Sequence, residues 1–122
     1  MDLTILKELG LTEGEIKTYL ALLKIGQNST GPIAKESQVS RSKLYSILDK
    51  LEKKGMVSHV EKNGVIYFQA AEPTKINDYI LKKQQSLNKL ETDFQTFLPK
   101  LELYAKQTKK EQNVSIYQGL KG

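Results

Sequence analysis

One stretch near the middle of the chain places apolar residues along a single helix face. They follow the i, i+3, i+4, i+7 spacing of a half-buried helix: Leu44, Ile47, Leu48 and Leu51. Ser40 stands where an N-cap is expected, and Gly55 stands where such a helix ends. The pattern therefore predicts a helix over residues 41–54, with one buried face and a polar face opposite.

Shorter helices are predicted before this one. A first helix of one or two turns stops at Gly10. Thr12 then has the position of an N-cap, and Glu15 is its capping-box partner three residues later. A third helix over residues 31–37 leads through a tight turn into the capped helix. The third and fourth helices together have the order of a helix-turn-helix.

Two β-prone runs follow and meet at Asn63-Gly64. Asn-Gly between alternating apolar positions is a strong signal for a type I′ hairpin turn. The apolar strand positions are Val57, Val60, Val65, Tyr67 and Phe68. The order of helices and hairpin predicts a mainly α fold with a small β-hairpin, a winged helix-turn-helix over residues 1–72.

After Pro73 the apolar spacing changes to that of a coiled coil. From Leu87 onward the gaps alternate between three and four residues, and Lys83 occupies one core position. We expect a long dimerisation helix over residues 73–110, and its apolar stretch from Ile76 to Tyr104 would be about 40 Å long at 1.5 Å per residue. The alternative is that the stripe packs on its own winged helix. The positions assigned to the seam are Ile76, Ile80, Leu87, Leu90, Phe94, Phe97, Leu101 and Tyr104.

The end of the chain breaks this pattern. Pro99 removes a backbone donor and clashes with the preceding turn, so the helix is expected to kink or to stop and restart there. Residues 111–122 are expected to form a tail, and residues 114–119 within it resemble a single strand with no neighbour to pair with. Either the chain is then a fragment of something longer, or the tail is disordered or pairs with a second subunit.

Composition limits the classes of function. The 122 residues are 39% hydrophobic and 27% charged, which is typical of a globular protein. There is no apolar run near the roughly 20 residues of a membrane span, and the N-terminus lacks the features of a signal peptide. The absence of cysteine excludes disulfides and fits a cytoplasmic protein. A net charge of +5 favours a polyanionic partner, although a solvated lysine-rich surface would give the same value.

Duplex DNA is the polyanion that a winged helix would bind. The first turns of the helix over 41–54 would enter the major groove, and the hairpin tip would reach the backbone or a minor groove. Asp49 opposes phosphate contact, so this helix is expected to enter by its N-terminal end. The candidate DNA-binding residues are Ser40, Arg41, Ser42, Lys43, Tyr45, Ser46, Lys50, Lys62 and Asn63.

The sequence gives little support for a metal site or for catalysis. His59 is the only histidine, and without cysteines it has no companions for a ligand set. In a strand it is expected to be a partly exposed pairing partner. There is no nucleophile with an adjacent base and no glycine-rich phosphate loop. We therefore expect no cofactor, no metal and no enzymatic activity.

Residues 9–23 and 39–57 resemble the N-terminal domain of the TrmB family of archaeal transcriptional regulators. The most specific part is Arg41-Ser-Lys-x-Tyr45, followed by Leu48-x-x-Leu51-x-x-x-Gly55. The resemblance covers roughly residues 5–75, and the long helix after it matches the family's dimerising helix in position. It implies a homodimeric winged-helix regulator in which Arg41, Ser42, Lys43 and Tyr45 face DNA.

Many members of this family carry a C-terminal effector domain that binds sugars. Residues 114–119 are similar to the first strand of such a domain, where this sequence ends, so no sugar site is implied and any effector is unknown. Two other functions remain compatible with the sequence. One is a winged-helix module for protein–protein interaction, and the other is a chromatin protein that binds any duplex.

Overall fold

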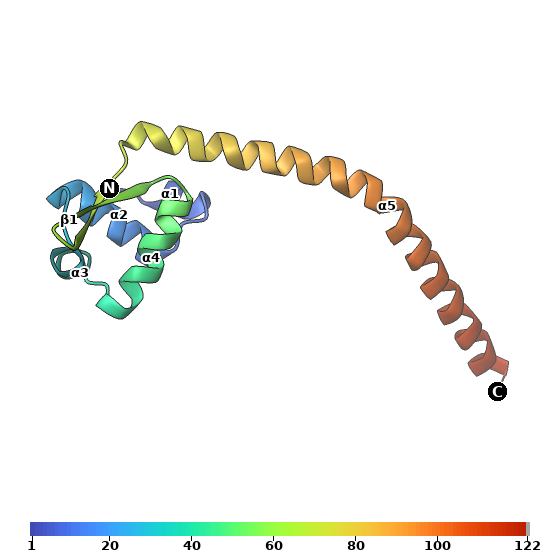
Figure 1. Cartoon of the computed structure of the whole chain (residues 1–122). Helices are drawn as coiled ribbons and strands as arrows, with labels where there is room; N and C mark the ends of the chain where they lie inside the picture. Colours follow the sequence, from blue (N-terminus) through green and yellow to red (C-terminus); the bar gives the residue numbers. More distant parts are fainter. Residues whose placement is uncertain (122) are drawn as a thin grey trace. The chain divides into compact units, whose positions relative to one another are not determined.

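Short helices, a hairpin and one long helix follow one another along the chain (Figure 1). The structure is a computed structural model that describes the backbone of residues 1–121 and the side chains of residues 1–110. The first four helices are α1 (Thr4–Glu8), α2 (Glu13–Ile25), α3 (Thr30–Ser37) and α4 (Arg41–Lys53). The strands β1 (Val57–Lys62) and β2 (Val65–Ala70), a 3₁₀ turn (Pro73–Lys75) and α5 (Ile76–Lys121) complete the order.

The chain divides into two compact units, Met1–Lys82 and Lys83–Gly122. The first unit is a winged helix-turn-helix, as the sequence predicts, but it extends beyond residue 72. The Tyr79 hydroxyl at the start of α5 donates to the Leu9 carbonyl over 3.1 Å. Ile76 packs against the core of the same unit. The first turns of α5 therefore belong to the winged-helix unit. Ile76, which the sequence pattern assigns to the dimer seam, packs against the core of its own winged-helix unit.

The core of the first unit lies between α2, α3, α4 and the base of the hairpin. Ile33, Leu44 and Leu51 have no exposed surface, so α3 and α4 are fixed at the centre of the unit. Burial of a Leu or Ile side chain contributes about 1.5–3 kcal/mol relative to exposure. The buried cluster comprises Leu11, Ile16, Tyr19, Leu22, Ile33, Leu44, Leu48, Leu51, Met56, Val57 and Phe68.

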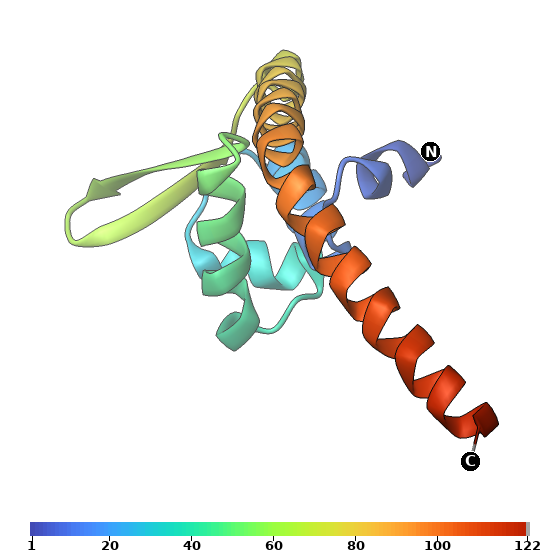
Figure 2. The ribbon, with the colours of Figure 1, turned by 90° about the vertical axis from the view of Figure 1, so that its right-hand side faces the viewer.

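The hairpin has the predicted turn. The strands pair antiparallel with Val57 opposite Ala70 and Lys62 opposite Val65. Asn63 and Gly64 have φ values of 53° and 77°, the left-handed pair that a type I′ turn requires. Figure 2 shows the hairpin as an arm that extends away from the helices of the first unit. We call β1, β2 and this turn the wing.

The predicted side-chain cap of α2 is formed, whereas the predicted side-chain cap of α4 is not. The Thr12 hydroxyl accepts from the Glu15 N–H, and the Glu15 carboxylate accepts from the Thr12 N–H, so the predicted capping box is formed. Ser40 occupies the N-cap of α4, but its side chain bonds no backbone N–H. Its hydroxyl lies 3.3 Å from that of Ser42 instead.

The long helix continues through Pro99 without a break. Figure 1 shows α5 bending in its orange segment, near residue 100, as expected for a proline that removes a backbone donor. The predicted strand over 114–119 is wrong, because α5 continues to Lys121. A helix satisfies its own backbone hydrogen bonds, whereas a lone strand cannot. The side chains of this tail lie outside the described residues.

Over residues 1–121, no helix combines the length and the apolar character needed to cross a membrane.

Candidate nucleic-acid interface

A tight turn sets the start of α4. Gln38 adopts a left-handed conformation with φ 61°, and its N–H bonds the Ala34 carbonyl over 2.9 Å. The buried Ser37 hydroxyl then accepts from the Val39 N–H over 3.3 Å. These bonds end α3 and redirect the chain within three residues. The turn therefore holds α4 at a fixed angle to α3, as a helix-turn-helix requires.

The two faces of α4 differ as the sequence predicts. Leu44, Leu48 and Leu51 are buried against the other helices. The opposite face carries hydroxyls, two lysines and one aromatic side chain, all exposed. Asp49 also lies on this side, but Lys53 pairs with it at 3.1 Å, which partly offsets its negative charge. The exposed candidates on α4 and at its N-cap are Ser40, Arg41, Ser42, Lys43, Tyr45, Ser46 and Lys50.

Arg41 reaches back toward the start of α3. Its Nη2 donates to the Thr30 hydroxyl over 3.1 Å. Thr30 is only 8% exposed, so the acceptor is a fixed point of the fold. The other guanidinium nitrogens have no hydrogen-bond partner within residues 1–110 and keep their donors for a ligand. The sequence predicts Arg41 at this surface but gives no sign of the bond to Thr30.

The wing carries the two remaining candidates, Lys62 and Asn63, which are both exposed. Lys62 does not extend freely into solvent. Its Nζ donates to the Gln27 side chain over 3.2 Å and lies 5.9 Å from the centre of the Tyr67 ring. These contacts hold one positive charge near the wing tip, in a position that the sequence alone does not specify.

The base of the wing is fastened to α4. His59 Nδ1 lies 2.5 Å from the Glu52 carboxylate, and its ring packs at 5.8 Å and 51° on Phe68. The sequence interpretation of His59 as a partly exposed pairing partner agrees with this arrangement. The contact joins β1 to α4, so the wing and the candidate DNA-facing helix are held together at this point.

A second support joins α2 to the end of α4. Lys54 Nζ lies 2.5 Å from the Glu15 carboxylate, which is 1% exposed. Burial opposes ionisation of Glu15, but the hydrogen bonds from Lys54 and the Thr12 N–H and the charge of Lys54 outweigh it. The pKa of Glu15 is therefore below its ordinary value. One Glu15 carboxylate oxygen takes part in the capping box, and the other binds Lys54 at the end of α4.

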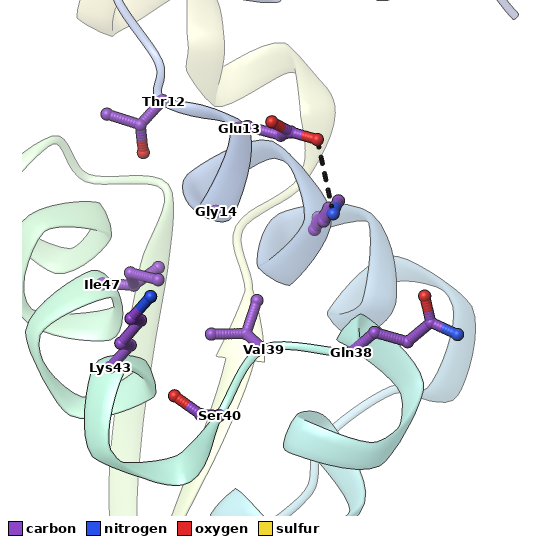
Figure 3. Close-up of a pocket in the computed structure, with 9 residues that line it drawn as sticks. Thr12, Glu13, Gly14, Gln38, Val39, Ser40, Lys43 and Ile47 are labelled. Atoms are coloured by element: carbon purple, nitrogen blue, oxygen red, sulfur yellow. Dashed lines mark ion pairs between the residues drawn. The ribbon is translucent and has the colours of Figure 1, made fainter.

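A polar groove lies beside the first turns of α4. It has a cavity volume of about 510 Å³ and is bordered by the start of α2, the helix-turn-helix turn and α4. Figure 3 shows the Lys43 ammonium group and the Ser40 hydroxyl beside this space. Gly14 allows the close approach of α2 to α4, since a Cβ there would lie 2.7 Å from Ile47 Cδ1. Thr12 and Gly14 also border this surface. The sequence pattern predicts Thr12 only as a helix cap and assigns no role to Gly14.

These features define a winged-helix protein with a basic, hydroxyl-rich helix face next to a β-hairpin wing. The family model described as "Sugar-specific transcriptional regulator TrmB" matches residues 6–74. The chain therefore belongs to the TrmB family of transcriptional regulators, whose winged helix is a DNA-binding domain.

Two curated relatives are similar over part of their length. An uncharacterised protein of Bacillus subtilis, YrhO, is 36% identical over 95 residues, which are 78% of this chain and 34% of that protein. The sugar-sensing regulator TrmBL1 of Pyrococcus furiosus is 36% identical over 62 residues, 51% of this chain and 18% of that protein. The chain thus spans about a third or less of the relatives it matches, and relatives occur in bacteria as well as archaea.

Solved structures share the fold. TrmBL2, an archaeal chromatin protein whose structure shows a novel mode of DNA binding, matches with a TM-score of 0.65 at 26% identity. That match covers 79% of this chain and 37% of TrmBL2. A MarR-family regulator of Silicibacter pomeroyi matches with a TM-score of 0.51 at 17% identity, over 72% of this chain and 65% of that one, which shows the fold alone.

Proposed function

We propose that this chain is a sequence-specific, double-stranded DNA-binding regulator that acts as a homodimer. In this proposal α4 enters the major groove by its N-terminal end, and the wing contacts the DNA backbone. The observation that carries the proposal is the outward face of α4, where cationic and hydroxyl side chains are exposed while the opposite face is buried. Membership of the TrmB family supports DNA as the ligand.

The roles of the α4 residues follow from their chemistry. Arg41 carries a planar set of donors that matches the O6 and N7 acceptors of guanine. Lys43 and Lys50 have no ion-pair partner within residues 1–110 and would neutralise phosphates. Tyr45 would donate its hydroxyl to the backbone, and the short serines permit close approach of the helix. The residues proposed to contact DNA are Ser40, Arg41, Ser42, Lys43, Tyr45, Ser46, Lys50, Lys62 and Asn63.

The second unit supports a dimer. Side chains of α5 from Leu87 to Tyr104 form an apolar stripe, and its members are exposed in the single chain. A stripe with gaps of three and four residues is typical of a coiled-coil seam. The same pairing would present two copies of α4 to one duplex, and the operator would then be a pseudo-palindrome.

Selection of an operator followed by substitution tests the proposal. A duplex would be selected from a random library with the parent chain, and binding of Arg41→Ala to it would then be measured. We expect a loss of about 1–3 kcal/mol and a relaxed preference at one base pair. Lys106→Gln, an exposed change on α5, is the matched control and should bind as the parent does. Equal affinity and equal base preference for Arg41→Ala would refute the major-groove assignment.

The similarity to TrmBL2 favours a second candidate, a chromatin protein that binds duplexes without regard to sequence. The same selection experiment distinguishes the sequence-specific regulator from the chromatin protein. A specific regulator binds its selected duplex on the order of 10³-fold or more tightly than random DNA at physiological salt, whereas a chromatin protein gives a ratio near one.

A further inference from the structure

The apolar stripe of α5 is uncovered in the described part of the chain. Six of its side chains are between 42% and 68% exposed. They repeat with gaps of three and four residues, so they fall on one seam of the helix. These residues are Leu87, Leu90, Phe94, Phe97, Leu101 and Tyr104. A stripe of this length needs a partner helix with the same periodicity, and a second copy of α5 has it.

We propose that the second copy lies antiparallel to the first, with the two-fold axis between Phe94 and Phe97. This inference rests on the homodimer proposed above and adds its orientation. In this register Leu90 faces Leu101 of the second copy, and Phe94 faces Phe97 of the second copy. Leu87 likewise faces Tyr104 of the second copy. Each layer of the seam then joins two different positions.

The charges beside the seam favour this orientation. Asp93 and Lys100 both border the stripe on the same side, and both side chains are exposed. Neither has an ion-pair partner within residues 1–110. In the antiparallel register Asp93 of each copy lies beside Lys100 of the other, so two symmetric ion pairs form. In a parallel, in-register dimer the same residues would face Leu98 and Ala105, and no ion pair would form.

The polar core position gives a second, separate reason. Lys83 lies four residues before Leu87 and falls on the seam. A parallel dimer would bring two Lys83 ammonium groups together in one layer, with like charges facing each other. The antiparallel register places Lys83 opposite Thr108 of the second copy instead. The repulsion between the two copies is thereby removed.

Thiol cross-linking of the full chain tests the orientation, because the native sequence contains no cysteine. Two variants are made, Leu90→Cys and Leu101→Cys, and one is lengthened by a tag so that the mixed product is resolved by mass. Each is oxidised alone and after the two are refolded together. Thr92→Cys, on the side of α5 away from the seam, is the control for random collision.

The antiparallel dimer predicts a cross-link only in the mixed sample, where the two introduced thiols meet across one layer. A cross-link in Leu90→Cys alone and in Leu101→Cys alone, with none in the mixed pair, would overturn the orientation but leave the homodimer standing. A monomeric mass for the parent chain by light scattering would overturn both the homodimer and its orientation. The three results are thus distinguishable.

Charge reversal provides a second readout that needs no cysteine. Lys100→Asp alone should weaken dimerisation roughly 5- to 30-fold, since two ion pairs become two repulsive contacts. Adding Asp93→Lys to the same chain restores opposite charges between the copies, and the dimer constant should recover. Failure of the double variant to recover would contradict the antiparallel register.

Discussion

The Arg41 guanidinium donates a hydrogen bond to the Thr30 hydroxyl over 3.1 Å, which joins the first residues of α4 and α3. Thr30 is nearly buried and Arg41 is exposed, so the fixed Thr30 hydroxyl orients the charged Arg41 side chain. An arginine held in one pose loses less conformational freedom when it binds a base edge. Thr30 is therefore expected to act on DNA recognition without touching DNA.

Thr30→Val tests this relationship because valine has nearly the same shape and lacks the hydroxyl. We expect operator binding to weaken by about 0.5–1.5 kcal/mol, because the released arginine side chain must then be ordered when DNA binds. The slope of binding against salt should not change, since no phosphate contact is removed. Thr30→Ser keeps the hydroxyl and should behave as the parent does in anisotropy titrations. If Thr30→Val and Thr30→Ser bound equally well, the bond would have no part in recognition.

Glu15→Gln is expected to destabilise the fold in a pH-dependent manner. The variant leaves Lys54 without its carboxylate partner and should lower the free energy of unfolding at pH 7 by about 1–3 kcal/mol. Because the folded pKa of Glu15 is below its ordinary value, this contribution is present above the unfolded pKa. It is lost as the pH falls through the folded pKa.

Urea unfolding of parent and variant at pH 7 and in acid measures this difference. Glu13→Gln is the matched control, since the exposed pair of Glu13 with Lys17 at 3.3 Å should contribute less than 1 kcal/mol. The gap between parent and Glu15→Gln should shrink in acid. A gap that stayed constant with pH would show that the carboxylate charge is not the cause.

Lys62→Ala is expected to weaken binding to all duplexes alike. In the proposed mode Lys62 contacts a phosphate, so its loss should make the log–log salt slope shallower by about one. Base preference should not change. Tyr67→Leu, which removes only the ring beside the ammonium group, should keep the slope of the parent. A slope unaffected by Lys62→Ala would exclude the wing lysine from the phosphate contacts.

Leu90→Asp combined with Phe94→Asp places charges at two seam positions of α5. Burial of a carboxylate in an apolar seam is costly, so the variant should be monomeric in sedimentation or light scattering. Operator binding should fall sharply, because one chain then presents only one α4. The first unit should unfold at the same temperature as before, since these residues lie outside it. An unchanged dimer mass would refute the seam.

Features that depend on neighbouring residues could be predicted from the sequence. The Thr12–Glu15 capping box and the Asn63–Gly64 turn are set within four residues, and both form as expected. Contacts between distant segments could not be predicted. Lys54 meets Glu15 across 39 positions and Lys62 meets Gln27 across 35, because only packing of the whole unit brings them together.

Two departures have specific physical causes. The tail pattern over 114–119 is β-prone, but the preceding helix can extend and satisfy the backbone without a partner strand. The spacing of Ile76 is compatible with a position in the coiled-coil seam and equally with a position in the core of the winged helix. The structure packs it on the core, because the Tyr79 bond to Leu9 holds the first turns of α5 there.

The central claim is that this chain binds duplex DNA through phosphate contacts of its winged helix. Its most direct test is fluorescence anisotropy with a labelled random-sequence duplex across a series of salt concentrations. A dimer with about six phosphate contacts should bind at low salt and give a log–log slope near −5. The absence of binding at low salt would contradict the account.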